Sequence, residues 1–409
     1  MAGPLDGVRV LDFGRWMTAP ACARILADLG ADVIKVEARG SPDPLRGMVE
    51  LTAATYTNGD MSKAAVIPNS TFDITNRGKR SIALDLTKVE GRDIAYKLVG
   101  KADVLVHNWR QKAAKRLGME FETLVKYNPR LIYGSVSAWG PEGPDADEPA
   151  MDAAASARAG MMYQWGGPEM PPLLHMGGIA DQSTAIAMVE AILAALFARE
   201  RTGIGQKIDA SLLGSMVALG ATHIQAQLIR GFTITRRDRV KTSNPLATYY
   251  RCSDDKWILL SMYKADKYWP ALCRAIGALE LERDPRFENI LVRSKHAEEL
   301  VTILDRIFGT KPSDEWALIF SENDLIYGRV QTIPDLVKDP QLSANDYIVD
   351  FDHSKWGRVK VVGFPYRFSA SPQELGREAP EFGQNTDEVV MELGYTSEDI
   401  ARLRAEEII

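Results

Sequence analysis

The first forty residues alternate between strand and helix patterns, and this alternation limits the fold more than any other feature of the chain. Short apolar runs typical of buried strands occupy residues 8–13 (VRVLDF) and 32–37 (DVIKVE). Between them, residues 21–30 (ACARILADLG) have helical spacing and end in glycine. We therefore predict a βαβ unit, in which the two strands run parallel.

The same alternation continues further along the chain. Helices are predicted at residues 90–100 and 112–118, and strands at residues 102–108 and 130–140. Apolar strands in this arrangement predict an α/β fold with a Rossmann-like large domain, whose mostly parallel sheet is covered on both faces. Ligands of such sheets gather beyond the carboxyl ends of the strands, which here means the segments that follow Phe13, Glu37, Val106 and Val136.

A second domain is expected because 409 residues exceed what one hydrophobic core usually serves. The basic, polar segment 231–245 lacks helical periodicity and indicates a linker. We predict a large domain over residues 1–225, a small α/β domain over 226–329, and a C-terminal segment, 330–409, that returns to the large domain. The longest apolar stretch, 185–198, is too short to span a bilayer comfortably and is expected to be a buried helix.

Charge and motifs argue against several classes of function. A net charge of −6 disfavours nucleic-acid and membrane partners, and no secretory signal is visible near the first residues, so we expect a cytoplasmic protein. The three cysteines form no CxxC pair and the five histidines form no HxxxH or HxH motif, which argues against a disulfide framework and a metal site. The turn after the first strand, 14–20 (GRWMTAP), lacks two glycines of the nicotinamide-binding GxGxxG motif, and neither GxSxG nor a Walker loop is present.

The candidate catalytic residue is Asp181, which lies in the stretch LHMGGIADQSTAI (174–186). An aspartate at this point either caps a helix through backbone N–H groups, or acts as a nucleophile beside glycines that leave room for a ligand. His175, six residues before it, is either a structural histidine or a second catalytic group.

Two basic clusters, 76–86 and 107–118, are candidates for binding phosphate. The second cluster follows a predicted strand, opens a helix and contains Trp109 among its cations. This combination suits a ligand that carries both phosphate and a stackable ring, such as an adenine nucleotide.

Several long motifs in one order also resemble those of a known family. They are PLDGVRVLDFG (4–14), ADLGADVIKVE (27–37), NRGKRSIALDL (76–86), ADVLVHNWR (102–110), NPRLIYGSVSAWGPEGP (128–144), IADQSTA (179–185), ARERTGIGQKIDASLL (198–213), DPQL (339–342) and TDEVVMELGY (386–395). With these motifs the chain resembles the class III CoA-transferases, which include formyl-CoA, carnitine and bile-acid CoA-transferases and, as cousins, the α-methylacyl-CoA racemases.

The resemblance implies that Asp181 attacks the thioester of an acyl-CoA donor. An acyl-aspartyl anhydride forms, then an aspartyl-CoA thioester, and an acceptor carboxylate collects the CoA through a second anhydride. We expect the helix start to favour the ionised form of the Asp181 carboxylate, so Asp181 needs no separate base to act as a nucleophile. Capping of the helix by the same carboxylate is compatible with this role. Backbone donors near Gly177 and Gly178 are expected to hold the tetrahedral oxyanion.

The resemblance also implies the partners of the chain. Coenzyme A, as free CoA or acyl-CoA, enters as a substrate, and no tightly bound cofactor is expected. The other partners are a carboxylic acid acceptor and a second copy of the chain, in an interlocked homodimer of the family's fold.

The residues implied to bind CoA follow position by position from the motifs. They are Met17, Thr18, Arg39, Leu84, Asp85, Leu86, Thr87, Asn108, Trp109, Arg110, Arg116 and Asp152. One of them is displaced: the family's arginine directly after Glu37 is replaced by Ala38, and Arg39 stands one place later.

Other departures from the family bear on specificity. The racemases carry a histidine where this chain has PAMDAAA (149–155), which favours a transferase, and the glycine run of oxalate-type enzymes is replaced by TSNPLATYYR (242–251). Bulky apolar residues expected near the acyl group are either core filling or a substrate cage: Trp16, Trp139, Met161, Met162, Tyr163 and Trp165. We expect an acyl group larger and more apolar than formyl. An acyl-CoA racemase or isomerase, a non-catalytic acyl-CoA-binding protein and a hydride-transfer enzyme remain as alternatives.

Overall fold

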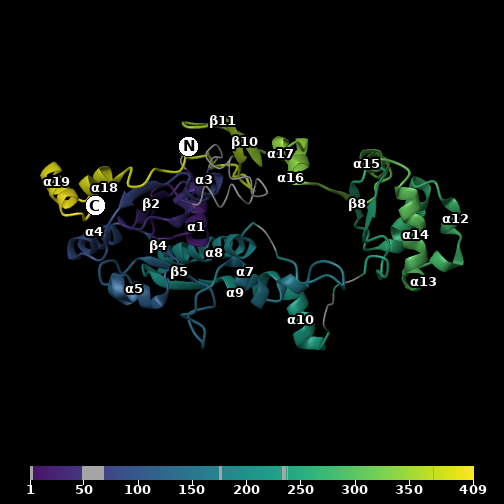
Figure 1. Ribbon diagram of the computed structural model, residues 1–409, viewed down its shortest axis with the longest axis horizontal. Coiled ribbons are helices and arrows are strands. Elements are labelled where there is room, and N and C mark those ends of the chain that lie inside the picture. The colour runs from purple at the N-terminus through teal and green to yellow at the C-terminus, as the bar shows by residue number, and fades with distance from the viewer. Residues whose placement is uncertain (1–2, 48–68, 175–176, 233–235, 237, 372) are drawn as a thin grey trace. The chain divides into compact units, whose positions relative to one another are not determined.

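The computed structural model describes residues 3–47, 69–174, 177–232, 236, 238–371 and 373–409 (Figure 1). By their internal contacts the residues form two compact units. The first consists of Met1–Met162, Leu174–Phe232 and Asp346–Ile409, and the second of Tyr163–Leu173 and Thr233–Asn345. The unit boundaries after Phe232 and Asn345 fall later in the chain than the domain limits expected at 225/226 and 329/330, which stay a prediction.

The first unit contains a six-stranded, fully parallel sheet with the strand order β3-β2-β1-β4-β5-β6. Its strands are β1 (Arg9–Asp12), β2 (Asp32–Glu37), β3 (Arg80–Ala83), β4 (Val104–His107), β5 (Ile132–Ser137) and β6 (Gln206–Ser211). The chain builds outward from β1 in one direction and from β4 in the other. The prediction of an α/β fold with a parallel sheet is therefore confirmed, and the topological switch point lies between β1 and β4.

Helices cover both faces of this sheet. Their bounds are α1 (Thr18–Asp28), α3 (Ser70–Asn76), α4 (Val89–Gly100), α5 (Gln111–Leu117), α6 (Phe121–Leu124), α7 (Asp152–Arg158), α8 (Ile179–Thr202), α9 (Leu212–Leu219), α10 (Ala221–Arg230), α18 (Thr386–Glu392) and α19 (Ser397–Ala405), with 3₁₀ turns at Pro44–Gly47 and Met161–Tyr163. Side chains alternate along each strand, so β1 sends Val10 into one core and Leu11 into the other.

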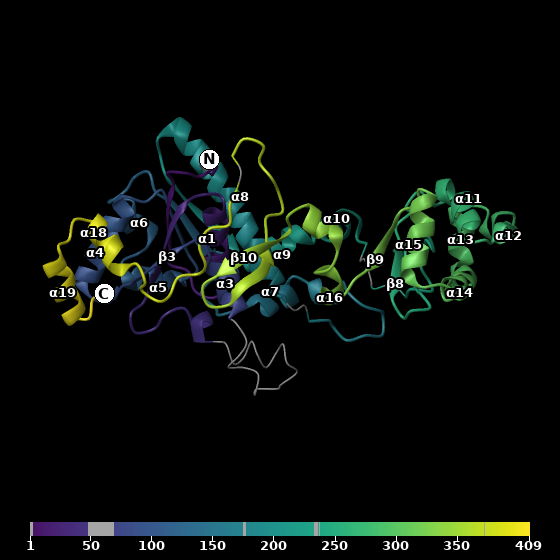
Figure 2. The ribbon, with the colours of Figure 1, turned by 90° about the horizontal axis from the view of Figure 1, so that it is seen from above.

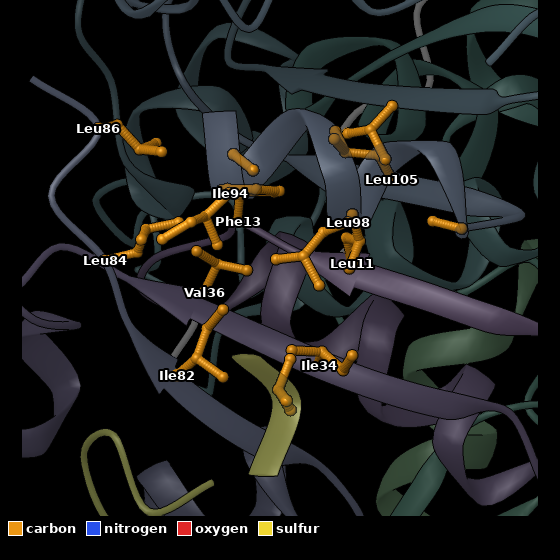
Figure 3. Close-up of a cluster of buried hydrophobic side chains, with 14 of the residues drawn as sticks. Leu11, Phe13, Ile34, Val36, Ile82, Leu84, Leu86, Ile94, Leu98 and Leu105 are labelled. Atoms are coloured by element: carbon orange, nitrogen blue, oxygen red, sulfur yellow. The ribbon is translucent and has the colours of Figure 1, made fainter. Parts of the chain in front are cut away.

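On the face of Leu11 the core contains Ile34 and Leu105 from the sheet with Ile94 and Leu98 from α4 (Figure 3). Helices α18 and α19 lie beside α4 in both ribbon views and add apolar side chains to this core (Figures 1 and 2). These side chains are Val389, Val390, Ile400 and Leu403. Residues more than 280 positions from α4 in sequence thus close the same core.

The opposite core is dominated by α1 and α8. By length and composition alone α8 could cross a membrane, but Met188, Val189 and Ile192 are buried against α1 and the sheet. This packing identifies α8 as a core helix, as the sequence predicted for 185–198. The helix begins at Ile179, six residues before the apolar stretch 185–198, and Gly178 precedes it with a left-handed φ of 68°.

After the second unit the chain forms an antiparallel hairpin, β10 (Ile348–His353) with β11 (Gly357–Val362). The His353 ring stacks on Trp356 with ring centroids 3.7 Å apart, which fixes the turn between the two strands. From here the chain runs to α18 and α19 in the first unit.

The second unit packs helices on a three-stranded antiparallel sheet with the order β7-β8-β9. Its elements are β7 (Tyr249–Arg251), β8 (Trp257–Leu260), β9 (Tyr327–Val330), α11 (Ala265–Ala275), α12 (Leu279–Glu282), α13 (Ile290–Lys295), α14 (Ala297–Phe308), α15 (Ser313–Glu322), α16 (Ile333–Leu336) and α17 (Pro340–Ala344), with a 3₁₀ turn at Pro285–Phe287. An aromatic cluster of Phe308, Trp316 and Phe320 lies at its centre, with ring centroids 5.2 to 5.7 Å apart.

The return of α19 to the first unit can be tested by truncating Leu403, which is 1% exposed. We expect Leu403→Ala to lower the free energy of unfolding by about 2–5 kcal/mol, because it leaves a cavity in the core. Met391→Ala on the exposed side of α18 is the control, and a change of less than about 0.5 kcal/mol is expected there. Denaturant unfolding of both variants measures the difference, and equal effects would contradict the packing.

Candidate active site

A pocket of about 450 Å³ opens at the carboxyl ends of β1, β4 and β5, where the strand order reverses. Such a switch point is the usual ligand site of an open parallel sheet. Six of the residues proposed from the sequence line this pocket together: Thr18, Asn108, Trp109, Arg110, Asp152 and Asp181. The sheet topology therefore gathers side chains that are up to 163 positions apart in the chain.

The Asp181 carboxylate lies at the wall that α1 and α8 share. Thr18 is the first residue of α1, is 3% exposed, and donates its hydroxyl hydrogen to Oδ1 of Asp181. Among the described residues Thr18 is the one hydrogen-bond donor to this carboxylate, so Oδ2 has no protein partner there. One oxygen of Asp181 is held and the other is left for a ligand.

Asp181 does not cap α8, so that expectation is wrong. It is the third residue of the helix, and Gly178 at the cap position makes no side-chain cap. The backbone N–H groups of Ala180 and Asp181 instead donate to Oδ2 of Asp152, at 2.6 and 3.0 Å. The carboxylate of Asp152, at the start of α7, thus satisfies the first turn of α8 from another helix and frees that of Asp181.

Because Asp152 binds the first turn of α8, it also places a second negative charge near the Asp181 carboxylate. Burial raises the pKa of the Asp181 carboxyl to about 6, the Thr18 hydrogen bond lowers it in part, and the nearby Asp152 carboxylate raises it again. The expectation that the helix start favours the anion and so lowers the pKa of Asp181 is wrong, because burial raises the pKa by more than the favourable contacts lower it. At neutral pH the group is still mostly ionised, which is the form that a nucleophile needs.

The loop before α1 is held on both sides by polar contacts. Asn108 spans the main chain of Arg15, because its Oδ1 accepts from the Arg15 N–H at 3.0 Å and its Nδ2 donates to the Arg15 carbonyl at 2.7 Å. The N–H of Trp16 donates to Asp43 at 3.0 Å, and Trp16 has a left-handed φ of 64°, which is uncommon for a bulky residue. The Asn108 amide, expected to contact CoA, is engaged with this loop.

Two buried lysines complete the support of this loop. Lys35 Nζ donates to the Gly14 carbonyl at 3.0 Å and to Asp43 at 2.9 Å. Lys79 Nζ donates to Asp12 at 2.7 Å and to the Pro20 carbonyl at 2.8 Å.

Burial lowers the pKa of Lys79 to about 8, although the Asp12 carboxylate favours the ammonium form. Lys35 was not proposed as a functional residue from the sequence. Lys79 belongs to the basic cluster 76–86, a candidate for binding phosphate, but its ammonium group is buried and engaged by Asp12. The signal that could have found them is a Lys in the apolar run 32–37 and an Asp in the apolar run 8–13.

Met17 packs against the start of α8. A Cβ atom added to Gly178 would lie 2.6 Å from the Met17 sulfur, so this position accepts only glycine unless Met17 moves. Gly177 and Gly178 both have left-handed φ angles, 92° and 68°. His175 lies outside the described residues, and the oxyanion role expected for the two glycines stays a prediction.

The residues expected at the nucleotide end are not among those that line the pocket at the switch point. Leu84 and Leu86 are buried in the core, and the Asp85 carboxylate accepts from both the backbone N–H and the hydroxyl of Thr87. Arg39 pairs with Glu407 at 3.3 Å. Arg116 is exposed on α5. Their contacts with CoA stay a prediction.

The bulky apolar residues expected near the acyl group lie in different environments. Trp16 lines the pocket, whereas Met161 is buried in a cluster against which Trp139 packs. Tyr163 and Trp165 belong to the second unit. Trp16 is thus the one member of this set that lines the pocket of the first unit among the described residues, and the substrate cage stays a prediction.

His107, at the end of β4, is a buried histidine that sequence reasoning did not single out. Its Nδ1 accepts from the Trp109 N–H at 3.1 Å, and its ring centroid lies 5.2 Å from that of Trp109. Burial lowers the pKa of His107 to about 3, so the ring is neutral at physiological pH. It positions Trp109 at the pocket and does not exchange protons near neutrality.

The raised pKa of Asp181 has a consequence for stability. A carboxyl whose pKa is higher in the folded state stabilises the fold at low pH, and that stability is lost as pH rises through about 6. We expect Asp181→Asn to raise the free energy of unfolding by about 1–3 kcal/mol near pH 8 and by less near pH 5. Thermal unfolding at both pH values measures this, with the exposed Asp6→Asn as control. A variant less stable than wild type near pH 8 would contradict the burial of an anion.

The chain is similar to known proteins over nearly its whole length. Residues 5–386 match the model of CoA-transferase family III. An acyl-CoA transferase from Fusarium pseudograminearum (strain CS3096) is 34% identical over 414 residues, covering 100% of this chain and 88% of the relative. Cinnamoyl-CoA:phenyllactate CoA-transferase from Clostridium sporogenes is 31% identical over 410 residues, covering 99% and 97%. The crystal structure of a CAIB/BAIF family protein from Brucella suis is 28% identical with a TM-score of 0.82, covering 96% and 100%.

Proposed function

Because the chain belongs to CoA-transferase family III, we propose that it moves CoA from an acyl-CoA donor to a free carboxylic acid with Asp181 as the nucleophile. The observation that carries this proposal is the hydrogen bonding of the Asp181 carboxylate. Its Oδ1 accepts a hydrogen bond from Thr18, while its Oδ2 has no partner among the described residues. The carboxylate lines a pocket of about 450 Å³ at the switch point of the sheet.

The proposed reaction is a series of acyl transfers. Oδ2 of Asp181 attacks the thioester carbonyl of the donor, a C–O bond forms, and CoA leaves as the thiolate. The thiolate attacks Cγ of Asp181 and releases the donor acid, which leaves an aspartyl-CoA thioester. The acceptor carboxylate then attacks the same Cγ, and the released thiolate attacks the acceptor's acyl carbon to form the new thioester.

Two side chains that line the same pocket as Asp181 are suited to binding the acyl-CoA substrate. Trp109 and the exposed Arg110 follow β4 at the pocket, where an aromatic ring and a guanidinium can hold an acyl-CoA. CoA acts as substrate in this proposal, with no tightly bound cofactor.

We propose an acyl group larger and more apolar than formyl. The pocket is lined by Trp16, Pro149, Met151 and Leu212 near the nucleophile. The relative from Clostridium sporogenes is named for cinnamoyl-CoA and phenyllactate, which both carry an aromatic ring. Aromatic and branched acids, with their 2-hydroxy derivatives, are therefore the first donors and acceptors to test.

We propose a homodimer on the basis of large apolar side chains exposed on α8 and α10. Ile186 and Phe197 on α8 are each 61% exposed, and Leu228 and Ile229 on α10 are exposed as well. Burying such side chains against a second copy of the chain would remove them from water. A cytoplasmic location is part of the proposal, since the three cysteines are free and buried.

The nucleophile can be tested directly. We expect Asp181→Asn to lower the transfer rate by at least about 10³-fold, because the amide is a poor nucleophile at the reacting carbonyl. Transfer is measured by mass spectrometry of new thioesters in a panel of acyl-CoAs and acids. The control is the exposed Asp6→Asn, for which the wild-type rate is expected. Transfer by Asp181→Asn at the wild-type rate would refute the role of Asp181.

The pH dependence tests the ionisation state. Only the ionised Asp181 attacks, and burial raises its pKa to about 6, so we expect kcat/KM to fall about tenfold for each unit of pH below that value. Rates are measured with a donor and an acceptor acid whose own pKa values lie well below this range. An acid limb centred near the ordinary aspartate value, about 4, would contradict the effect of burial.

A further inference from the structure

Thr18 makes a contact with the reacting carboxylate that the proposed mechanism has not yet used. We propose that the Thr18 hydroxyl is the oxyanion donor for attack on Cγ of Asp181, so that Thr18 is a catalytic residue in the two steps in which the aspartyl carbonyl is the electrophile. The inference rests on the proposed function, because it concerns intermediates carried by Asp181.

The two attacks on Cγ place negative charge on a side-chain oxygen of Asp181. In the first, the CoA thiolate adds to the anhydride carbonyl, a C–S bond forms, and the bond to the donor carboxylate breaks. In the second, the acceptor carboxylate adds to the thioester carbonyl, a C–O bond forms, and the C–S bond breaks to release thiolate. Each addition converts the carbonyl oxygen into an oxyanion before the leaving group departs.

The oxygen that becomes this oxyanion is identified by the hydrogen bond. Oδ1 of Asp181 already accepts from Thr18, so Oδ2 is the oxygen free to attack the donor thioester. Oδ2 then becomes the bridging atom of the anhydride and leaves with the donor acid. Oδ1 remains as the carbonyl oxygen of the anhydride and of the thioester, next to the Thr18 hydroxyl.

The position of Thr18 is set by polar groups that hold the loop preceding α1. Thr18 follows the loop whose backbone Asn108 and Asp43 hold, and Lys35 holds Gly14 at the start of the loop. Thr18 is 3% exposed and lies in the first turn of α1. The hydroxyl is therefore fixed without rearrangement of the loop, which is the requirement for an effective oxyanion donor.

The position of Asp181 is set independently from α7. Asp152 accepts from the N–H groups of Ala180 and Asp181 and so holds the first turn of α8. Because these amides are engaged with Asp152, they do not serve the Asp181 side chain. Among the described residues this leaves the Thr18 hydroxyl as the donor to the reacting group.

The test uses Thr18→Val, which keeps the shape of the side chain but removes the hydroxyl, with Thr18→Ser as the matched control that keeps it. Each full-length protein is charged with an acyl-CoA donor, freed of excess CoA ester, and mixed with the acceptor acid. Mass spectrometry of the intact protein follows the loss of the CoA adduct from Asp181 with time. We expect discharge by Thr18→Val to be about 100-fold slower than wild type, the effect of removing one oxyanion donor, and Thr18→Ser to stay within a few fold.

A second readout separates this role from simple packing. Removing the hydroxyl removes the hydrogen bond that favours the anion, so the acid limb of kcat/KM is expected at higher pH in Thr18→Val than in Thr18→Ser. If Thr18→Val does not fold, Thr18→Ala replaces it in both measurements. Discharge by a folded hydroxyl-free variant within about threefold of wild type would overturn the inference. A wild-type protein that never carries CoA on Asp181 would overturn the proposed function itself.

Discussion

The arrangement of the site depends on two lysine ammonium groups buried under the carboxyl end of β1. Lys79 is neutralised by Asp12, and Lys35 by Asp43, and all four side chains are fully buried. Buried charges are costly unless they are paired and hydrogen-bonded. The groups around these lysines must therefore keep the positions in which they accept the lysine hydrogen bonds. That geometry includes the carbonyls of Gly14 and Pro20, which bracket the loop carrying Trp16 and Thr18. Replacing Lys35 by an apolar residue would leave the buried Asp43 carboxylate without its cation, whereas Asp12 has both Lys79 and Lys35 within 4 Å.

The second constraint is that Asp152 and Asp181, which lie close together, have different roles. Asp152 stabilises the start of α8 by accepting two backbone N–H groups, which is the role expected of an aspartate at a helix start. Asp181 is thereby left with a raised pKa and one unpartnered oxygen. A carboxylate that gains little from the fold is more reactive than one fully engaged in it, and perturbed carboxyls of this kind are typical of functional sites. The same neighbour that secures the helix also adds charge repulsion to the nucleophile.

Much of the fold follows from local patterns in the sequence. The unit β1-α1-β2 and the strands β4 and β5 lie where apolar periodicity predicted them, and the parallel sheet follows from their alternation with helices. The placement of Asp181 beside glycines at a helix start was also predictable. What could not be predicted is set by contacts between distant positions: the bond of Asp152 to the turn 28 residues later, and that of Thr18 to Asp181, 163 residues away. Local propensity carries no information about such pairs, and so the helix cap was assigned to the wrong aspartate.

The central claim is that a side-chain oxygen of Asp181 exchanges with the substrates in every turnover. In the proposed route the acceptor acid forms an anhydride with Asp181, and the thiolate then attacks the acceptor's carbonyl, so the bridging oxygen stays on the aspartate. The measurement is transfer with an acceptor whose carboxylate carries oxygen-18, followed by mass spectrometry of the peptide that contains residue 181. We expect oxygen-18 in Asp181 after one turnover, and no oxygen-18 there when donor or acceptor is omitted. Full transfer of CoA with no label in Asp181 would contradict it.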